Sequence, residues 1–424
     1  MIRLNHNSTP VLILRSDSHG GLNIMRSLGL LGVDVYNLDP SVIAPANFSS
    51  YCRGRFVWDI EHAPDRESLD YLSEVRRKIG RPPILIPTTD RTARFVARWS
   101  ATLHDWFVFP DQPPGLVDAL ASKEGMYGLA IRHRIPTPKC VFPTSRGEVV
   151  DFLATATFPI ILKGIDGQRL WERTGKRMFV ESSSAELLQT YDRSEDPDRP
   201  NLMLQEYIPG GDDTIWMFNG YFDAASECAV GFTGKKIRQC PVHTGCTSLG
   251  ICLPNPEVEQ ITRRFMKAVG YRGIVDIGYR YDARDGLYKV LDVNPRIGAT
   301  FRLFVGENGI DVVRALYMDL SGQQIVPSAA PEGRKWIVED LDLVSAYRYY
   351  REGSLTINEW FRSLSGIDEA AFLSWRDPVP FLFMLFNRIP EFLKRAYRKF
   401  HSPAPKLKRG SDAAPELRVQ KLRK

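Results

Sequence analysis

The sequence predicts an α/β N-terminal domain, a central α+β region and a mostly helical C-terminal extension. Short apolar runs alternate with amphipathic stretches over residues 10–115, which is typical of a doubly wound parallel sheet. Two apolar runs at residues 273–281 and 287–292 flank a short polar turn, and this pattern predicts an antiparallel hairpin. After residue 335 the apolar residues follow helical spacing, so a separate extension is expected there.

The first region is expected to alternate strands with helices. The expected strands are residues 11–14, 33–38, 56–59 and 84–87, and the expected helices are residues 22–31, 69–78 and 91–102. The polar loop from Ser16 to Gly21 follows the first strand and opens a helix, whose free N–H groups can bind an anion. It lacks the G-x-G-x-x-G pattern, so a dinucleotide site is only a weak expectation.

The central region contains a strand that ends in lysine. Residues 159–163 form an apolar run closed by Lys163, and the glycine-bearing residues 164–175 are predicted to be a mobile loop. Residues 327–334 are predicted to be a linker. The remaining expected strands are residues 203–207, 216–222 and 229–233, and the expected helices are residues 123–133, 257–269 and 310–320.

The C-terminal segment combines helices with basic residues. A strand at residues 336–341 is expected to return to the main sheet, before helices at residues 343–351 and 357–364. Residues 380–386 are strongly apolar, and residues 390–400 alternate aromatic side chains with Lys and Arg. Such a segment can lie in a membrane interface, but a terminal helix packed on the core is the preferred interpretation.

Composition excludes several classes of protein. The 424 residues suffice for two or three domains, and 43% hydrophobic with 25% charged residues is typical of a globular protein. The first ten residues are polar, and no run approaches the roughly 20 apolar residues that span a bilayer. Six scattered cysteines indicate reduced thiols, so a cytoplasmic protein is expected.

Much of the net charge of +6 comes from the C-terminal residues. No nucleic-acid-binding motif accompanies them, so no nucleic-acid partner is expected.

The most informative motif is Asp292-Val293-Asn294-Pro295-Arg296, at the end of a predicted strand. Residues two apart on a strand share a face, so Asp292, Asn294 and Arg296 are expected to point the same way. A carboxylate and an amide oxygen at this spacing can hold Mg²⁺, which usually also binds nucleotide phosphates. The arginine can bind a phosphate or carboxylate oxygen. Taken alone, the motif can equally be a strand end with an Asx-type turn into proline.

Other segments occur in an order that matches this motif. Lys163 ends a buried strand before a glycine-bearing stretch, and residues 205–213 combine a strand edge with two acids. Together with Asp276 and the Asp292 motif, this order resembles the ATP-grasp superfamily of carboxylate ligases over roughly residues 10–320. Within that superfamily, the chain looks like the predicted carboxylate–amine ligase group.

The resemblance implies an ATP-grasp fold with a pre-ATP-grasp domain in front of two subdomains that hold ATP between them. The implied divisions are residues 10–115 for the pre-ATP-grasp domain, 116–200 for the N-subdomain, 201–326 for the C-subdomain, 335–401 for the C-terminal extension and 402–424 for a basic disordered tail.

The resemblance also implies roles for individual residues. Lys123 and Lys163 match the two lysines that contact ATP phosphates, and Arg296 matches the residue facing the transferred phosphate and acyl group. Asp292 and Asn294 match the ligands of Mg²⁺, for which Mn²⁺ is an alternative. The positions that match the adenine and ribose site are Gln205, Glu206, Tyr207, Ile208 and Asp213.

One position departs from the family pattern. The earlier metal carboxylate usually precedes an aromatic residue, but here Gly278 precedes Tyr279. Asp276, two residues earlier on the same strand face, is the expected substitute. Two questions are left open: whether one or two Mg²⁺ ions bind, and whether the site has lost its pair of metal ions. The basic residues expected near an acidic substrate are Lys235, Lys236, Arg238 and His243.

The resemblance implies an ATP-dependent ligase that joins a small-molecule carboxylate to an amine through an acyl phosphate. Such an enzyme mainly positions its substrates and neutralises charge. The expected partners are the carboxylate and the amine, and a homodimer is left open. The alternative is an ATP-binding sensor or scaffold without catalysis, in peripheral contact with a membrane through its C-terminal tail. Gly278 and the basic, aromatic C-terminal residues motivate that alternative.

Overall fold

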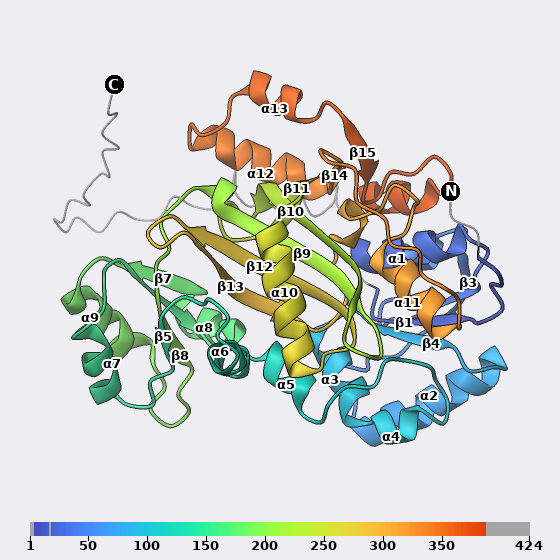
Figure 1. Cartoon of the computed structure of the whole chain (residues 1–424), viewed down its shortest axis with the longest axis horizontal. Helices are drawn as coiled ribbons and strands as arrows, with labels where there is room; N and C mark the ends of the chain where they lie inside the picture. Colours follow the sequence, from blue (N-terminus) through green and yellow to red (C-terminus); the bar gives the residue numbers. More distant parts are fainter. Residues whose placement is uncertain (1–3, 17, 387–424) are drawn as a thin grey trace, which may run out of the picture. The chain divides into compact units, whose positions relative to one another are not determined.

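The computed structural model describes residues 4–16 and 18–386 and divides the chain into two units, Met1–Phe381 and Leu382–Lys424. The first unit contains three sheets (Figure 1). The predicted basic segment at 390–400 and the predicted tail at 402–424 lie outside the described residues.

The N-terminal sheet is parallel, with strand order β3-β2-β1-β4. Its strands are β1 (Val11–Leu14), β2 (Val35–Leu38), β3 (Cys52–Phe56) and β4 (Ile84–Pro87). Its helices include α1 (His19–Gly29), α2 (Asp65–Ile79), α3 (Asp90–Arg98) and α4 (Ser100–Leu103). β1 is completely buried, as expected for an apolar strand between two parallel neighbours. The third strand lies at Cys52–Phe56 and not at the predicted residues 56–59. The prediction missed it because polar Arg53 and Arg55 alternate along this strand at the sheet edge.

The second sheet has the order β5-β8-β6-β7 and is built from antiparallel pairs. Its strands are β5 (Cys140–Val141), β6 (Ile160–Gly164), β7 (Met178–Glu181) and β8 (Leu202–Glu206), and its helices include α7 (Arg146–Leu153) and α9 (Ser184–Ser194). The predicted loop after Lys163 is instead helix α8 (Gly167–Thr174). Asp166 caps its N-terminus and Gly175 ends it in a left-handed conformation.

The third sheet has seven strands in the order β13-β12-β9-β10-β11-β14-β15. They are β9 (Ile215–Phe222), β10 (Cys228–Cys240), β11 (Cys246–Cys252), β12 (Gly273–Asp282), β13 (Leu287–Asn294), β14 (Lys335–Ile337) and β15 (Ile367–Ala370). The predicted hairpin of β12 and β13 is present, and the predicted return of a later strand to this sheet occurs at β14. Strand β11 was not predicted, and β10 is longer than expected.

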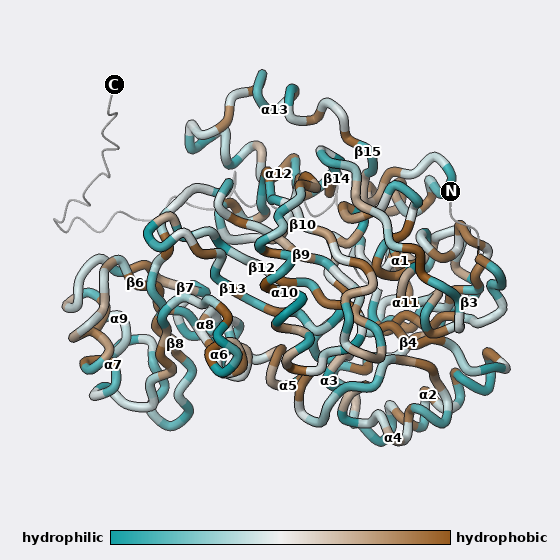
Figure 2. Tube along the Cα trace, in the orientation of Figure 1, coloured by the Kyte–Doolittle hydropathy of each residue, from teal (hydrophilic) through white to brown (hydrophobic). Residues whose placement is uncertain are grey.

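Helices pack on this sheet and complete the hydrophobic core. They include α5 (Leu116–Ala121), α6 (Lys123–Arg132), α10 (Pro256–Val269) and α11 (Val312–Leu320), with α12 (Glu339–Arg351) and α13 (Ile357–Ser363) following β14. One cluster joins Met126 and Tyr127 of α6 to Phe265 of α10 and Phe218 of β9. Figure 2 shows hydrophobic residues along β4 and hydrophilic residues on α2, as expected for a buried strand and an outer helix.

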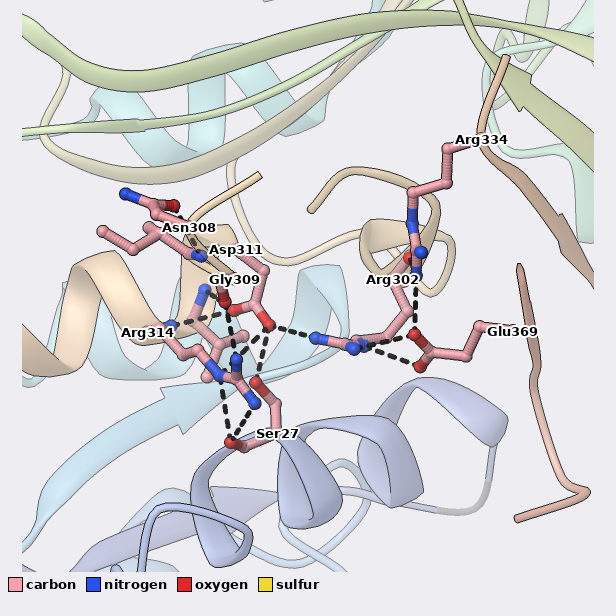
Figure 3. Close-up of polar contacts among 10 residues, drawn as sticks. Ser27, Arg302, Asn308, Gly309, Asp311, Arg314, Arg334 and Glu369 are labelled. Carbon is pink, nitrogen blue, oxygen red and sulfur yellow. Dashed lines mark hydrogen bonds and ion pairs between the residues drawn. The ribbon is translucent and has the colours of Figure 1, made fainter. Parts of the chain in front are cut away.

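A buried ionic network joins the N-terminal domain, the large sheet and the C-terminal extension (Figure 3). Asp311 is fully buried and accepts hydrogen bonds from Ser27 Oγ of α1 at 2.6 Å and from Arg302 Nη1 at 2.5 Å. Arg302 also donates to both carboxylate oxygens of Glu369 in β15, at 2.8 and 2.7 Å. Burial raises the pKa of Asp311, but Arg302 and Arg314 outweigh it and lower the pKa below its usual value.

Removing Asp311 should destabilise the protein strongly. Asp311→Ala leaves the Arg314 guanidinium without its carboxylate partner and removes one of the two carboxylates that bind Arg302, and we expect a loss of about 3–5 kcal/mol in the free energy of unfolding. Chemical denaturation measures this loss. The matched control is Asp192→Ala, which breaks an exposed ion pair with Arg146 and should cost about 1 kcal/mol or less. Equal losses in the two variants would contradict a stabilising role for the network.

Candidate active site

A row of polar side chains crosses the large sheet on one face. Asp276 in β12 is the register partner of Asn294 in β13 on one side and of Asn219 in β9 on the other. Asn294 Nδ2 donates to Asp276 Oδ2 at 3.3 Å and to Asp292 Oδ2 at 3.1 Å. The Asp276 and Asp292 carboxylates favour positive charge at the position between them, where the Asn294 N–H group lies. A cation would also be favoured there.

Two glycines leave room for these carboxylates. A Cβ atom added to Gly278 would lie 2.5 Å from Asp292 Oδ1, and one added to Gly298 would lie 2.5 Å from Asp276 Cγ. A larger residue at either position would therefore displace a carboxylate. The departure from the family pattern at Gly278 leaves space beside Asp292, and Asp276 supplies the second carboxylate on the same face.

The environment of Asp276 opposes its ionisation. Burial raises the pKa of Asp276 to about 6; Arg296 opposes this rise and Asp292 adds to it. The Lys236 ammonium also favours the charged carboxylate. A group with this pKa changes its charge just below neutral pH, and a bound cation would stabilise the ionised form.

Asp276→Asn should make the protein without ligand more stable at neutral pH. Because the folded-state pKa of Asp276 is raised, the wild type loses stability as pH rises from about 4 to about 6, by up to about 3 kcal/mol. The asparagine variant avoids this loss, so its melting temperature should exceed that of the wild type near pH 8 and match it near pH 4. Thermal unfolding at both pH values tests this, and a difference independent of pH would contradict it.

Two lysines from separate elements interact electrostatically with Asp292 and with each other. Lys163 is at the end of β6, and Lys123 is the first residue of α6. Lys123 Nζ donates to the carbonyl oxygens of Gly164 at 2.5 Å and Ile165 at 2.8 Å. Burial and, to a smaller extent, the Lys123 charge lower the pKa of Lys163 to about 8, against the opposing influence of Asp292. This pair of cations therefore favours an anionic ligand.

If Lys163 binds ATP phosphates as the sequence predicts, its lowered pKa makes that binding depend on pH. Lys163 is mostly charged near pH 7 and mostly neutral near pH 9, so the affinity for Mg-ATP should fall roughly tenfold between these values. Titration calorimetry at the two pH values measures the change. Lys163→Arg keeps its charge, so the fall should be smaller in that variant. An affinity that is unchanged in the wild type would contradict the role of Lys163.

The predicted adenine-binding strand is held by contacts from several elements. Gln205 is buried, and its Oε1 accepts a hydrogen bond from Tyr127 Oη at 3.1 Å. The Glu206 carboxylate forms ion pairs with Arg284 and Lys289, each at 3.1 Å, and so connects β8 to the β12–β13 hairpin. The Glu206 N–H donates to Lys139 O at 2.9 Å. Ile208 is 2% exposed, which leaves its side chain in the core.

Asp213, predicted to bind ribose, lies exposed in the short 3₁₀ helix η2 (Asp212–Thr214). The neighbouring Asp212 accepts hydrogen bonds from Tyr349 Oη at 2.5 Å and contacts His243 Nδ1 at 3.3 Å. Asp212 therefore connects η2 to α12, whereas the Asp213 carboxylate is exposed to solvent.

Arg296 is held by a residue that the sequence did not indicate. Its Nε donates to Asp90 Oδ1 at 2.8 Å, and Asp90 is the first residue of α3 in the N-terminal domain. Arg296 Nη2 also donates to Asn294 Oδ1 at 3.2 Å. Beyond Arg296, Ala299 packs against Gly20 at the start of α1, where an added Cβ would lie 3.1 Å from Ala299 Cα. The N-terminal domain therefore closes one side of the candidate site.

The basic residues predicted to bind substrate occupy different environments. Lys236 Nζ donates to Gly245 O at 3.0 Å and faces Asp276, while Lys235 lies over the Trp216 ring at 4.5 Å from its centre. Arg238, also predicted to contact substrate, is 3% exposed, and its Nε and Nη2 atoms donate to the Asp342 carboxylate at 2.8 Å.

His243 lies on the surface between two acidic side chains. Its Nδ1 is 3.3 Å from Asp212 Oδ1, and its Nε2 is 3.0 Å from Glu352 Oε2. Partial burial lowers the pKa of His243, but the hydrogen bonds with Glu352 and Asp212 outweigh burial and raise it. These contacts tie the β10–β11 loop to η2 and α12, which favours a structural role for the histidine.

The donor set fits Mg²⁺. Within residues 4–16 and 18–386, no group of three or more His, Cys, Asp or Glu side chains is arranged to hold a metal. Asp276 and Asp292 supply two carboxylates on one sheet face. The Asn294 amide presents Nδ2 to these carboxylates and Oδ1 to Arg296, so it would have to turn its oxygen toward them to act as a third ligand. Mg²⁺ commonly takes one or two protein carboxylates and completes its shell with phosphates and water, so this set suits it.

Comparisons with known structures identify the fold. N5-carboxyaminoimidazole synthetase from Staphylococcus aureus superimposes with a TM-score of 0.60, covering 79% of this chain and 83% of that chain at 10% identity. L-amino acid ligase from Bacillus licheniformis gives 0.57, covering 76% and 78% at 12% identity. The biotin carboxylase domain of 2-oxoglutarate carboxylase from Hydrogenobacter thermophilus, in complex with MgADP, gives 0.58, covering 78% and 74% at 14% identity. The chain therefore has the ATP-grasp fold, which confirms the predicted fold class.

The sequence is also similar to that of a ligase. D-aspartate ligase from Enterococcus faecium is 23% identical over 245 residues, which cover 56% of this chain and 58% of that enzyme. No family model matches the chain. In the part of the chain that the structure describes, every helix is too short or too polar to cross a membrane.

Proposed function

We propose that the protein is an ATP-dependent ligase that converts a small-molecule carboxylate to an acyl phosphate and joins it to an amine, releasing ADP. The observation that carries this proposal is the convergence of Lys123 and Lys163 on Asp292, with Asp276 and Asn294 beside it. Cations and oxygen donors in this arrangement suit a metal-bound triphosphate. The likeness to D-aspartate ligase and L-amino acid ligase supports the same reaction class.

Lys123 and Lys163 would bind the phosphates of ATP. Asp276, Asp292 and Asn294 would hold Mg²⁺, or Mn²⁺ as the alternative, and the metal when bound supplies further neutralising charge. Gln205 to Ile208 would lie along the adenine, with Asp213 near the ribose. The protein's contribution is then mostly alignment of the carboxylate with the terminal phosphate.

Arg296 would stabilise the negative charge that develops at the reacting acyl group. Its Nε and Nη2 atoms are fixed by Asp90 and Asn294, so the guanidinium is oriented before substrate binds. Because this hydrogen-bond donor is already oriented, it needs little reorganisation during the reaction. Asp90 is therefore a positioning residue in this proposal, acting through Arg296.

A second candidate function is ATP binding without catalysis. Gly278 favours it, because the second metal carboxylate would have to come from Asp276, whose pKa is raised. Peripheral membrane contact, part of the same alternative, would depend on residues after 386, which lie outside the described structure. The two candidates differ in one measurable property, which is ADP release that depends on a carboxylate and an amine.

The ligase should release ADP from Mg-ATP when pools of small carboxylates and amino acids are supplied. Asp292→Ala and Lys163→Ala should each lower this rate by about 10²–10³-fold, because each removes charge stabilisation at the phosphates. Asp192→Ala, on the exposed surface, should leave the rate unchanged. ATP binding without stimulated release from any pool would favour the second candidate, and full activity in Asp292→Ala would exclude the proposed site.

A further inference from the structure

A cavity of about 410 Å³ lies beside Arg296, on the side of the large sheet that faces the N-terminal domain. One wall comes from β4 and α3, a second from the connection before α5, and a third from the start of β12. Pro295, Arg296 and Ile297 line it next to the candidate active site. Its volume is within the range of small-molecule sites in proteins, and its walls come from two domains, where such sites are common.

The cavity is lined mainly by apolar side chains. They include Val96, Phe109, Val117, Tyr271, Ile274 and Leu316. Each of these is at most 8% exposed, so the walls belong to well-packed elements. An apolar surface of this kind favours aliphatic or aromatic groups over charged ones.

The charged residues of the cavity are mostly arginines. Arg98, Arg272 and Arg296 line it, and Asp118 is the acidic residue among the lining side chains. Arg98 pairs with Asp65, Arg296 pairs with Asp90, and Asp118 pairs with Arg94.

Arg272 differs from the other two arginines. No carboxylate of the described residues lies within ion-pair distance of it, and its buried Nε has no hydrogen-bond partner among them. Arg272 is therefore a lining cation whose charge no described carboxylate neutralises.

We propose that this cavity receives the apolar side group of the carboxylate substrate. The inference rests on the proposed ligase function. The reacting carboxylate would lie at Arg296, next to Asp292 and Asn294, while the side group extends between α3 and β12. The substrate class is therefore an aliphatic or aromatic carboxylic acid, rather than a small dicarboxylate such as aspartate.

Straight-chain carboxylates from acetate to octanoate test this directly. Calorimetry on the full chain with Mg-ADP should give a dissociation constant that falls about fourfold for each added methylene, until the cavity is full. Ala97 lines the cavity, so Ala97→Trp should abolish this dependence. Ala101→Trp, at an exposed position outside the lining, should retain it. If Ala97→Trp does not fold, Ala97→Leu makes the same test with a smaller expected effect.

The outcomes separate the cavity from the ligase reaction. Affinity that is independent of chain length, or a dependence that survives in Ala97→Trp, would overturn the assignment of the cavity. ADP release stimulated by aspartate but not by hexanoate would also overturn it, while leaving the ligase proposal intact. Chain-length-dependent binding without ADP release from any carboxylate and amine would support the cavity as a binding site and count against the ligase.

Discussion

The arrangement of the candidate site depends on one electrostatic constraint, the buried positive charge of Lys163. Burial and the nearby Lys123 charge both disfavour its protonated form, and Asp292, with a smaller contribution from Cys140, opposes them. The low-dielectric surroundings strengthen the repulsion between the two lysines, so the protonated form of Lys163 is energetically unfavourable unless an anion binds beside it. The elements that carry these residues come from separate sheets and a helix, so an anion bound there would also hold them together.

The remaining parts of the structure support that site from two directions. Asp90 of the N-terminal domain fixes Arg296, and the buried network of Arg302, Asp311 and Glu369 anchors the segment that follows it. The C-terminal extension therefore contributes to the position of the active-site segment without lying in the site. Strands β14 and β15 belong to the same sheet that carries Asp276 and Asp292.

Local sequence signals predicted the parts of the fold that depend on short-range chemistry. The β12–β13 hairpin and the strand that ends in Lys163 follow from apolar runs and turn residues, and the structure brings Lys163 near Asp292. Helix α8 was missed, although Asp166 before it and Gly175 after it are its start and stop signals. Asp90 and Tyr127 were not predicted as site residues, because their roles depend on contacts with residues 206 and 78 positions away in the chain. The ion pair of Arg238 with Asp342 was not predicted either, because the two residues are 104 positions apart.

The central claim is that Lys163 binds the phosphates of ATP. Proton uptake during Mg-ATP binding, measured by calorimetry near pH 8 in buffers of different ionisation enthalpy, tests this claim most directly. Lys163 is about half protonated in the free protein at that pH, and a bound phosphate should complete its protonation. The account predicts an uptake of about half a proton, lost in Lys163→Arg. Binding of Mg-ATP without proton uptake, or the same uptake in the variant, would contradict it.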